Sequence, residues 1–282
     1  MKIPDSKDSI FFSQYLPLLL TLVICVFLVG ALYIEILLLN IFTKADIATT
    51  IRWSDVLIGL TIYLKTSVDF AIFIGNLMAQ FPGWRGRVAI ELGTALGNAL
   101  GTMIILAIWN IFRNVEILLA MMVFVASLVL LKLAQESLEH AAQLHDKPIF
   151  GFLFRICEKS LRAINRTTGP VLNILIPNVS MSLRKNVTLV GLFGFSFSIP
   201  FILGLDDFAG YVPVFNLVNV FGFAIGVFVG HMILNIFLFL SPEKTIAAVK
   251  NPLISFAGTI AFIGLAIWGF YETFHILSQV HF

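Results

Sequence analysis

Six ionisable side chains lie inside apolar stretches of this 282-residue chain, and each needs a compensating partner or a chemical task. They are Lys65, Asp69, Glu91, Asp206, Asp207 and His231. An ionised side chain at the centre of a bilayer costs about 2.5–3.5 kcal/mol on insertion scales. One lysine against four carboxylates leaves a net charge of minus three if all of them ionise. We therefore expect bound cations or protons to compensate these carboxylates.

Polar side chains recur along residues 88–112 at the spacing of one helix face. They are Glu91, Thr94, Asn98 and Thr102, spaced three, four and four residues apart. Carboxylate, amide and hydroxyl oxygens are the ligands that Mn²⁺, Mg²⁺ and Ca²⁺ prefer. We therefore predict a divalent-cation site and no resident cofactor. Its expected ligands are Asp69, Asp207, Glu91 and Asn98. His231 adds an imidazole that can carry a proton or bind a transition metal.

Three further residues are assigned to this site from their positions. Lys65 lies four residues before Asp69, so the two can form an intrahelical salt bridge. Asn76 lies seven residues after Asp69 and returns to roughly the same face. Adjacent Asp206 and Asp207 point about 100° apart on a helix, so only one needs to face the core. The internal repeat favours Asp207, which leaves Asp206 to cap the helix or to face an outer vestibule.

The composition is that of an all-α integral membrane protein. Hydrophobic residues make up 59% of the chain and charged residues 12%, whereas about a quarter of a soluble domain is charged. The mean hydropathy is +0.98. Apolar stretches long enough to cross about 30 Å of hydrocarbon predict seven helices. These stretches are 15–42, 55–80, 88–112, 117–133, 187–210, 213–240 and 253–275.

The basic residues are distributed unevenly between the two sides of the predicted membrane protein. With seven crossings, fourteen of the 18 lysines and arginines fall on one side, three fall on the other, and Lys65 lies inside. Cytoplasmic loops carry the excess of basic residues. We therefore predict a multi-pass protein of the inner cell membrane with a cytoplasmic N-terminus and an outside C-terminus. The net charge of +2 gives no reason to expect a nucleic-acid partner.

The connection at residues 134–186 is the one sizeable segment that we expect outside the membrane. Basic residues recur in it at helical spacing among apolar ones, at Arg155, Lys159, Arg162 and Arg166. This pattern is typical of a helix on the inner membrane surface, with its basic face toward anionic lipid headgroups. The lipid bilayer and those headgroups are therefore the predicted partners, together with a small cation, and a homodimer stays open.

An internal repeat divides the rest of the chain. The ridge of Gly93, Gly97 and Gly101 recurs 129 positions later as Gly222, Gly226 and Gly230. Upstream of each ridge, Asp69-Phe70-Ala71 recurs as Asp207-Phe208-Ala209. Two matches in the same order indicate a duplicated unit of three helices, and an odd number of crossings inverts the second copy. The glycine ridges predict close helix packing.

The repeat predicts four segments. Residues 1–54 form an N-terminal transmembrane helix and an outer loop, and residues 55–133 form repeat one. Residues 134–186 form the cytoplasmic loop with its basic helix, and residues 187–282 form repeat two. Two similar halves of opposite orientation are the architecture of alternating access around a shared site near the membrane midplane. We therefore expect Asp69 and Asp207 to approach each other there.

The aspartate segments resemble those of the lysine exporter superfamily, which includes the cadmium-resistance, tellurium-resistance C and manganese-efflux families. Thr66-Ser67-Val68-Asp69-Phe70 and Leu205-Asp206-Asp207-Phe208 look most like the TxxD segment of the cadmium-resistance group. The resemblance covers the six repeat helices. It implies inverted three-helix repeats, each with an aspartate partway along its first helix. The chain departs from this pattern in its additional N-terminal helix, in Lys65 and in a less polar second repeat.

Three functions fit these observations. The first is a secondary transporter that exports a divalent metal cation, in exchange for protons. The chain has no nucleotide-binding loop, which favours an ion gradient as the driving force. The second is an exporter of a basic amino acid or another small organic cation, with Lys65 holding its carboxylate. The third is a non-transporting membrane scaffold or assembly protein. We expect no enzyme, because no HExxH, nucleophile elbow or GxGD aspartate pair is visible.

Overall fold

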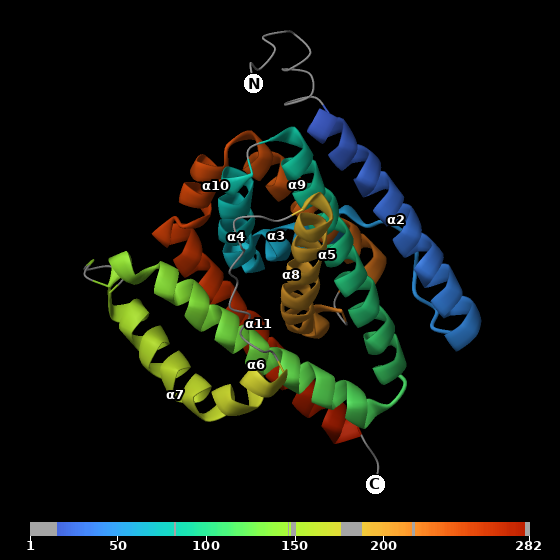
Figure 1. Cartoon of the computed structure of the whole chain (residues 1–282). Helices are drawn as coiled ribbons and strands as arrows, with labels where there is room; N and C mark the ends of the chain where they lie inside the picture. The colour runs from blue at the N-terminus through green and yellow to red at the C-terminus, as the bar shows by residue number, and fades with distance from the viewer. Residues whose placement is uncertain are drawn as a thin grey trace, which may run out of the picture. The chain divides into compact units, whose positions relative to one another are not determined.

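The computed structural model describes residues 16–81, 83–145, 147, 151–175, 188–215 and 218–279. Within these ranges the chain forms ten α-helices, two short 3₁₀ turns and no strand, which confirms the prediction of an all-α chain for this part (Figure 1). The helices are α2 (Leu16–Thr43), α3 (Trp53–Thr66), α4 (Val68–Gln80), α5 (Trp84–Phe112), α6 (Glu116–His140), α7 (Gly151–Leu175), α8 (Leu189–Tyr211), α9 (Val220–Leu240), α10 (Pro242–Val249) and α11 (Pro252–Gln279). The turns are η2 (Ala142–Leu144) and η3 (Val212–Val214).

Five of these helices are long and apolar enough to cross a membrane, namely α2, α5, α6, α9 and α11. Helices α3 and α4 supply a sixth crossing if the bent pair forms one span. Within α8, the apolar portion at Leu189–Phe201 is shorter. Large apolar side chains remain exposed along α2, including Val26, Phe27 and Ile34, as expected of a surface that faces lipid. The chain is therefore a multi-pass membrane protein by the length and composition of its helices.

The stretch 55–80 is not one continuous helix, so this part of the prediction is wrong. The helix is interrupted at Ser67, and α3 and α4 on either side of it differ in direction by 67°. At the break, the Thr66 hydroxyl donates to the carbonyl oxygen of Tyr63 at 3.1 Å. Serine and threonine side chains compete in this way for backbone hydrogen bonds and can bend a helix. Lys65 and Asp69 therefore belong to different helices. The Asp69 side chain lies outside the described residues, so its salt bridge with Lys65 stays a prediction.

The sixth predicted helix begins later than expected. The structure places a 3₁₀ turn at Val212–Val214, where the sequence predicted the start of a helix at residue 213, and α9 begins at Val220. The start of α9 is fixed by Asn219, whose side-chain oxygen accepts hydrogen bonds from the amides of Phe221 at 2.9 Å and Gly222 at 3.4 Å. An asparagine N-cap satisfies amides that have no partner inside the helix.

The described helices form two compact units, each built from segments that are distant in the sequence. The first unit contains α2, α3, α4 and α9, together with the first parts of α5, α8 and α10. The second unit contains α6, α7 and α11, together with the remaining parts of α5, α8 and α10. The four segments predicted from the repeat are not tested by this division and stay a prediction.

In the second unit, α6 and α11 pack side by side in opposite directions (Figure 1). Two side-chain to backbone hydrogen bonds join them. The Ser137 hydroxyl donates to the carbonyl of Ser255 at 2.8 Å, and the Thr259 hydroxyl donates to the carbonyl of Ala134 at 3.2 Å. Small residues allow the two backbones to approach closely enough for these bonds. Phe154 of α7 joins the apolar core beside them.

We predict that Gly269→Leu weakens the α6–α11 pair. A Cβ atom at Gly269 would overlap the Ser127 hydroxyl and lie 3.1 Å from Pro213 Cγ, so a leucine side chain has no room. Overpacking of this kind costs about 1–3 kcal/mol. The matched control is Gly264→Leu in the same helix, where a Cβ atom meets nothing within 4 Å. Thermal unfolding of the purified protein in detergent should separate the two variants, and equal midpoints would contradict the packing.

Candidate functional site

Helix α9 lies against α3 along its glycine ridge, with backbone touching backbone. A Cβ atom at Gly226 would overlap the carbonyl oxygen of Val56 and lie 2.8 Å from the amide nitrogen of Leu60. One turn earlier, a Cβ at Gly222 would lie 3.4 Å from the carbonyl oxygen of Arg52. Residue numbers therefore increase in the same direction along both helices, so α3 and α9 run parallel. Only glycine permits this approach.

Helix α5 lies against α8 in the same manner. A Cβ atom at Gly97 would overlap the carbonyl oxygen of Phe197, and one at Gly93 would lie 2.6 Å from that of Phe193. This pair is also parallel, because its contacts advance in the same direction. Gly101, the third member of the ridge, is buried.

The α3–α9 and α5–α8 pairs repeat the same spacing between contacting residues. The contacted carbonyls of α3 and α8 are separated by 141 positions in both cases, from residue 52 to 193 and from residue 56 to 197. The glycines that they meet are 129 positions apart in both cases, from 93 to 222 and from 97 to 226. The first helix of each predicted repeat therefore packs on the second helix of the other through equivalent glycines. The 141 positions between the contacted carbonyls differ by three from the 138 positions between Asp69 and Asp207.

A chain of buried polar side chains crosses the space between α3, α9 and α5. His231 is completely buried, and its Nδ1 atom lies 2.6 Å from the Tyr63 hydroxyl. Its Nε2 atom lies 3.0 Å from the amide nitrogen of Asn235, which also donates to the Thr94 hydroxyl at 3.2 Å. We call these four residues the His231 network. Phe70 of α4 closes one side, with its ring 5.4 Å from the imidazole.

The hydrogen bonds of the His231 network indicate which nitrogen of the neutral imidazole carries the proton. The Asn235 amide donates to Nε2, so a neutral imidazole carries its proton on Nδ1 and donates it to the Tyr63 oxygen. The Thr94 hydroxyl accepts from Asn235 and donates to the backbone carbonyl of Glu91 at 3.0 Å. Three helices are thus connected. Within the network, the His231 imidazole and the Tyr63 hydroxyl can exchange a proton, and the Asn235 amide and the Thr94 hydroxyl can hold a polar ligand.

Glu91 lies one turn before Thr94 on α5 and is 1% exposed. The Thr21 hydroxyl of α2 donates to its Oε1 atom. Its Oε2 atom is buried and has no hydrogen-bond partner among the described residues. A buried carboxylate oxygen without a partner is costly. This oxygen can therefore receive a cation or a proton, and so can the buried Oε2 atom of Glu35 on α2, which also has no hydrogen-bond partner among the described residues.

The remaining polar residues of the α5 stripe are also buried. Asn98 is 4% exposed and Thr102 is 1% exposed, and the Thr102 hydroxyl donates to the carbonyl of Asn98 at 2.7 Å. Asn76, in contrast, is exposed on α4. Lys65 is half-buried near the end of α3. Of the residues assigned to the site from sequence, the structure therefore places Glu91, Asn98 and His231 in the buried interior of the first unit.

The predicted metal site is not settled by these residues. Among the described side chains, no three histidines, cysteines, aspartates or glutamates converge as a metal ion would require. The side chains of Asp69, Asp206 and Asp207 lie outside the described residues. The backbone places Asp69 as the second residue of α4. A site formed by Asp69 and Asp207 with Glu91 and Asn98 stays a prediction.

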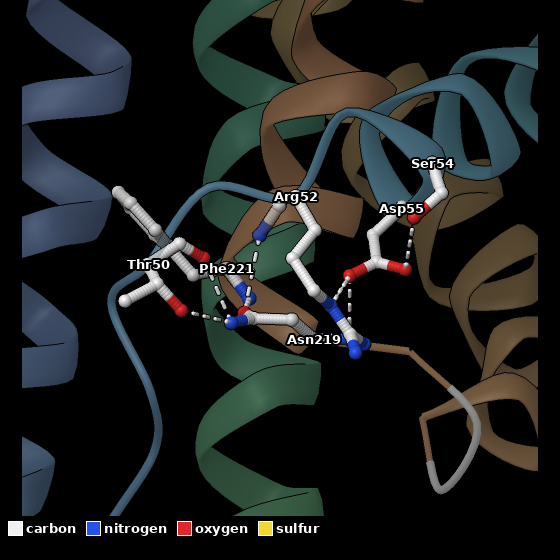
Figure 2. Close-up of polar contacts among 7 residues, drawn as sticks. Thr50, Arg52, Ser54, Asp55, Asn219 and Phe221 are labelled. Carbon is white, nitrogen blue, oxygen red and sulfur yellow. Dashed lines mark hydrogen bonds and ion pairs between the residues drawn. The ribbon is translucent and has the colours of Figure 1, made fainter.

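An ionic clamp that sequence reasoning missed joins the N-terminal ends of α3 and α9. Asp55 is 3% exposed and pairs with Arg52 Nε at 2.7 Å. The same carboxylate accepts the backbone amide of Asn219 at 3.1 Å, and the Asn219 side chain donates to the carbonyl of Thr50 at 2.8 Å. Figure 2 shows Asn219 between Asp55, which accepts its backbone amide, and Thr50, which accepts its side-chain amide. The Arg52 and Asp55 spacing was the available sequence signal.

The opposite end of α9 is held by α5. Arg87 donates to the carbonyl oxygen of Phe239 at 3.0 Å, and its guanidinium lies 5.2 Å from the centre of the Phe239 ring. The last carbonyls of a helix lack partners inside it and carry partial negative charge, which favours a cation there. Arg87 therefore fixes the end of α9 against the beginning of α5, so these two helices run in opposite directions.

Comparison of the chain with protein-family models, with curated proteins and with solved structures found no match. Function must therefore be argued from the residues themselves, and the resemblance to the lysine exporter superfamily rests on the short aspartate segments.

We predict that Gly226→Ala and Gly97→Ala each destabilise the first unit. Each added methyl group would overlap a backbone carbonyl oxygen, which cannot rotate away, and we expect a loss of about 1–3 kcal/mol. Gly194→Ala is the control, because it adds a methyl group to α8 where nothing lies within 4 Å. Thermal unfolding in detergent measures the difference. Ridge variants as stable as the control would rule out the backbone contact.

Proposed function

We propose that this protein is a secondary transporter that exports a divalent metal cation in exchange for protons. It would act by alternating access around the buried polar residues of α5 and α9. The reciprocal packing of the two glycine ridges carries the proposal. It joins the first helix of each predicted repeat to the second helix of the other through equivalent glycines, which is the arrangement expected of two duplicated halves that exchange conformations.

The directions of the helices support an inverted repeat. Helices α3 and α9 run parallel, α9 and α5 run antiparallel, and α5 and α8 run parallel. Helix α3 therefore opposes α8, and α5 opposes α9. Equivalent helices of the proposed halves thus point in opposite directions, as inversion requires. These are also the relative directions that the seven-crossing prediction assigns.

The break between α3 and α4 supports a substrate site in the first unit. Transporters commonly bind ions at discontinuous helices, where freed backbone groups and helix ends face the substrate. The break lies directly before Asp69 in the sequence, and Phe70, the next residue, contacts His231. The first unit therefore contains an interrupted helix, the buried carboxylate of Glu91 and the buried imidazole of His231.

We expect Glu91→Gln to reduce transport about tenfold or more, because the charged oxygen is lost while the size is kept. A charged hydrogen-bonding group contributes about 1.5–3 kcal/mol, which corresponds to about 10- to 100-fold. The assay is Mn²⁺ entry into proteoliposomes that contain a metal-sensitive dye, with Asp69→Asn measured in parallel. The control is Glu116→Gln, an exposed carboxylate in the first turn of α6. Full flux in both test variants would refute the site.

A second substrate is favoured by one observation. Glu91 is a single buried carboxylate with the Thr21 hydroxyl beside it, and such a group suits an ammonium group as well as a metal. A basic amino acid or another organic cation is therefore the alternative cargo. Competition between lysine and Mn²⁺ in the same proteoliposomes distinguishes the two. A folded protein that moves neither would favour the scaffold function.

We expect Tyr63→Phe to slow proton exchange about tenfold, because it removes the oxygen that accepts the proton of His231 Nδ1 and keeps the aromatic ring. An internal pH-sensitive dye measures the proton flux that accompanies transport. Tyr33→Phe on α2 is the control, since Tyr33 is exposed and packs beside Phe221 rather than His231. Unchanged coupling in Tyr63→Phe would remove the His231 network from the mechanism.

A further inference from the structure

Helix α7 presents three different faces, and only one of them is used in packing. Phe154 and Leu161 are buried in the core with the end of α6. On the same face, the Asn165 amide donates to the carbonyl of Leu131 at 3.2 Å and to the Gln135 side chain at 2.8 Å. These contacts fix the rotation of α7 about its axis. They therefore determine what its other two faces expose.

The second face of α7 is apolar and exposed. Phe152 is 65% exposed, Leu153 49% and Ile156 48%. Large apolar side chains gathered on a helix outside the spanning segments are typical of a helix that lies at the membrane interface. This face therefore suits the acyl region of a lipid.

The third face of α7 is basic and lines a cavity beside the apolar face. Its four cations lie at spacings of four, three and four residues, so they form one stripe. The cavity has a volume of about 560 Å³ and is lined by His145, Arg155, Glu158, Lys159, Arg162 and Arg166. An adjoining cavity of about 420 Å³ shares His145, Glu158 and Arg162 with it and reaches Gln135 and Glu139 of α6. We call the larger one the α7 cavity.

The described residues that line the α7 cavity leave its charge unbalanced. Four cations face one carboxylate, Glu158, which leaves a net charge of three positive units. Arg162 pairs with Glu158 at 2.7 Å. Lys159 and Arg166 form no ion pair among the described residues. Arginine and lysine donors around a cavity of this size match a phosphate group.

We propose that the α7 cavity binds the phosphate headgroup of an anionic phospholipid, whose acyl chains lie along the exposed apolar face of α7. Arg155, Lys159 and Arg166 contact the phosphate, and Glu158 acts as an internal anion that competes for Arg162. The adjacent apolar face favours a lipid over a soluble phosphate, because a soluble anion would make no use of it. This site is independent of the transported substrate.

Binding of short-chain phosphatidylglycerol to the full chain in a neutral detergent tests the proposal. Microscale thermophoresis should show tighter binding of this lipid than of short-chain phosphatidylcholine, which has no net charge. The double variant K159Q/R166Q should weaken phosphatidylglycerol binding about 25-fold, at about fivefold for each cation. The control K244Q/K250Q removes two exposed lysines at and beyond α10 and should bind as the unaltered chain does. Equal affinities in the two double variants would overturn the site.

Two further measurements keep the proposal falsifiable if the double variant unfolds. Glu158→Gln keeps every cation and frees Arg162, so phosphatidylglycerol should bind about threefold more tightly; weaker or unchanged binding contradicts the role of Glu158. Inorganic phosphate at millimolar concentration should compete only weakly. Displacement of the lipid by equimolar inorganic phosphate would assign the cavity to a soluble anion and overturn the lipid proposal.

Discussion

Apolar helices in a bilayer gain little by leaving lipid for one another, so close backbone contact must hold them together. The first unit meets this constraint at six glycines, each with a backbone carbonyl oxygen of the neighbouring helix or its N-cap within 3.4 Å of an added Cβ atom: Gly59, Gly93, Gly97, Gly222, Gly226 and Gly230. A methyl group would overlap the carbonyl oxygen and force the helices apart at Gly59, Gly93, Gly97 and Gly226. The pairing of Tyr63 with His231 depends on this approach, because it requires α3 to lie against α9.

The second constraint is that buried polar groups must bond to one another across helices. Helix α9 meets this constraint at three levels. Its first turn is tied to Asp55, its middle to Tyr63 and Thr94, and its end to Arg87. Helix α3 forms hydrogen bonds with the start and the middle of α9, and α5 forms them with its middle and its end. A shift of α9 would therefore disturb both neighbours. Movement in this unit therefore involves α9 together with its partners.

Much of the helical architecture could be predicted from the sequence, because apolar stretches and glycine ridges are local signals. The buried stripe at Glu91 and Asn98 follows from helical spacing alone. The break at Ser67 could not be predicted in this way, since no proline or glycine marks it. The pairing of Tyr63 with His231 joins residues 168 positions apart, so no local pattern contains it. The aspartate pair that defines the predicted metal site is still a sequence prediction.

The break at Ser67 also bears on how firmly the proposed site would hold an ion. It makes Asp69 the second residue of α4, and the aligned peptide dipoles give the first turn of a helix a partial positive charge. In the proposed transporter, a cation bound beside such a turn would gain less on binding than one bound beside the middle of a continuous helix. It would be captured less tightly and released sooner. For a carrier, whose turnover requires release on the far side as well as capture, the bent backbone would thus favour speed over affinity.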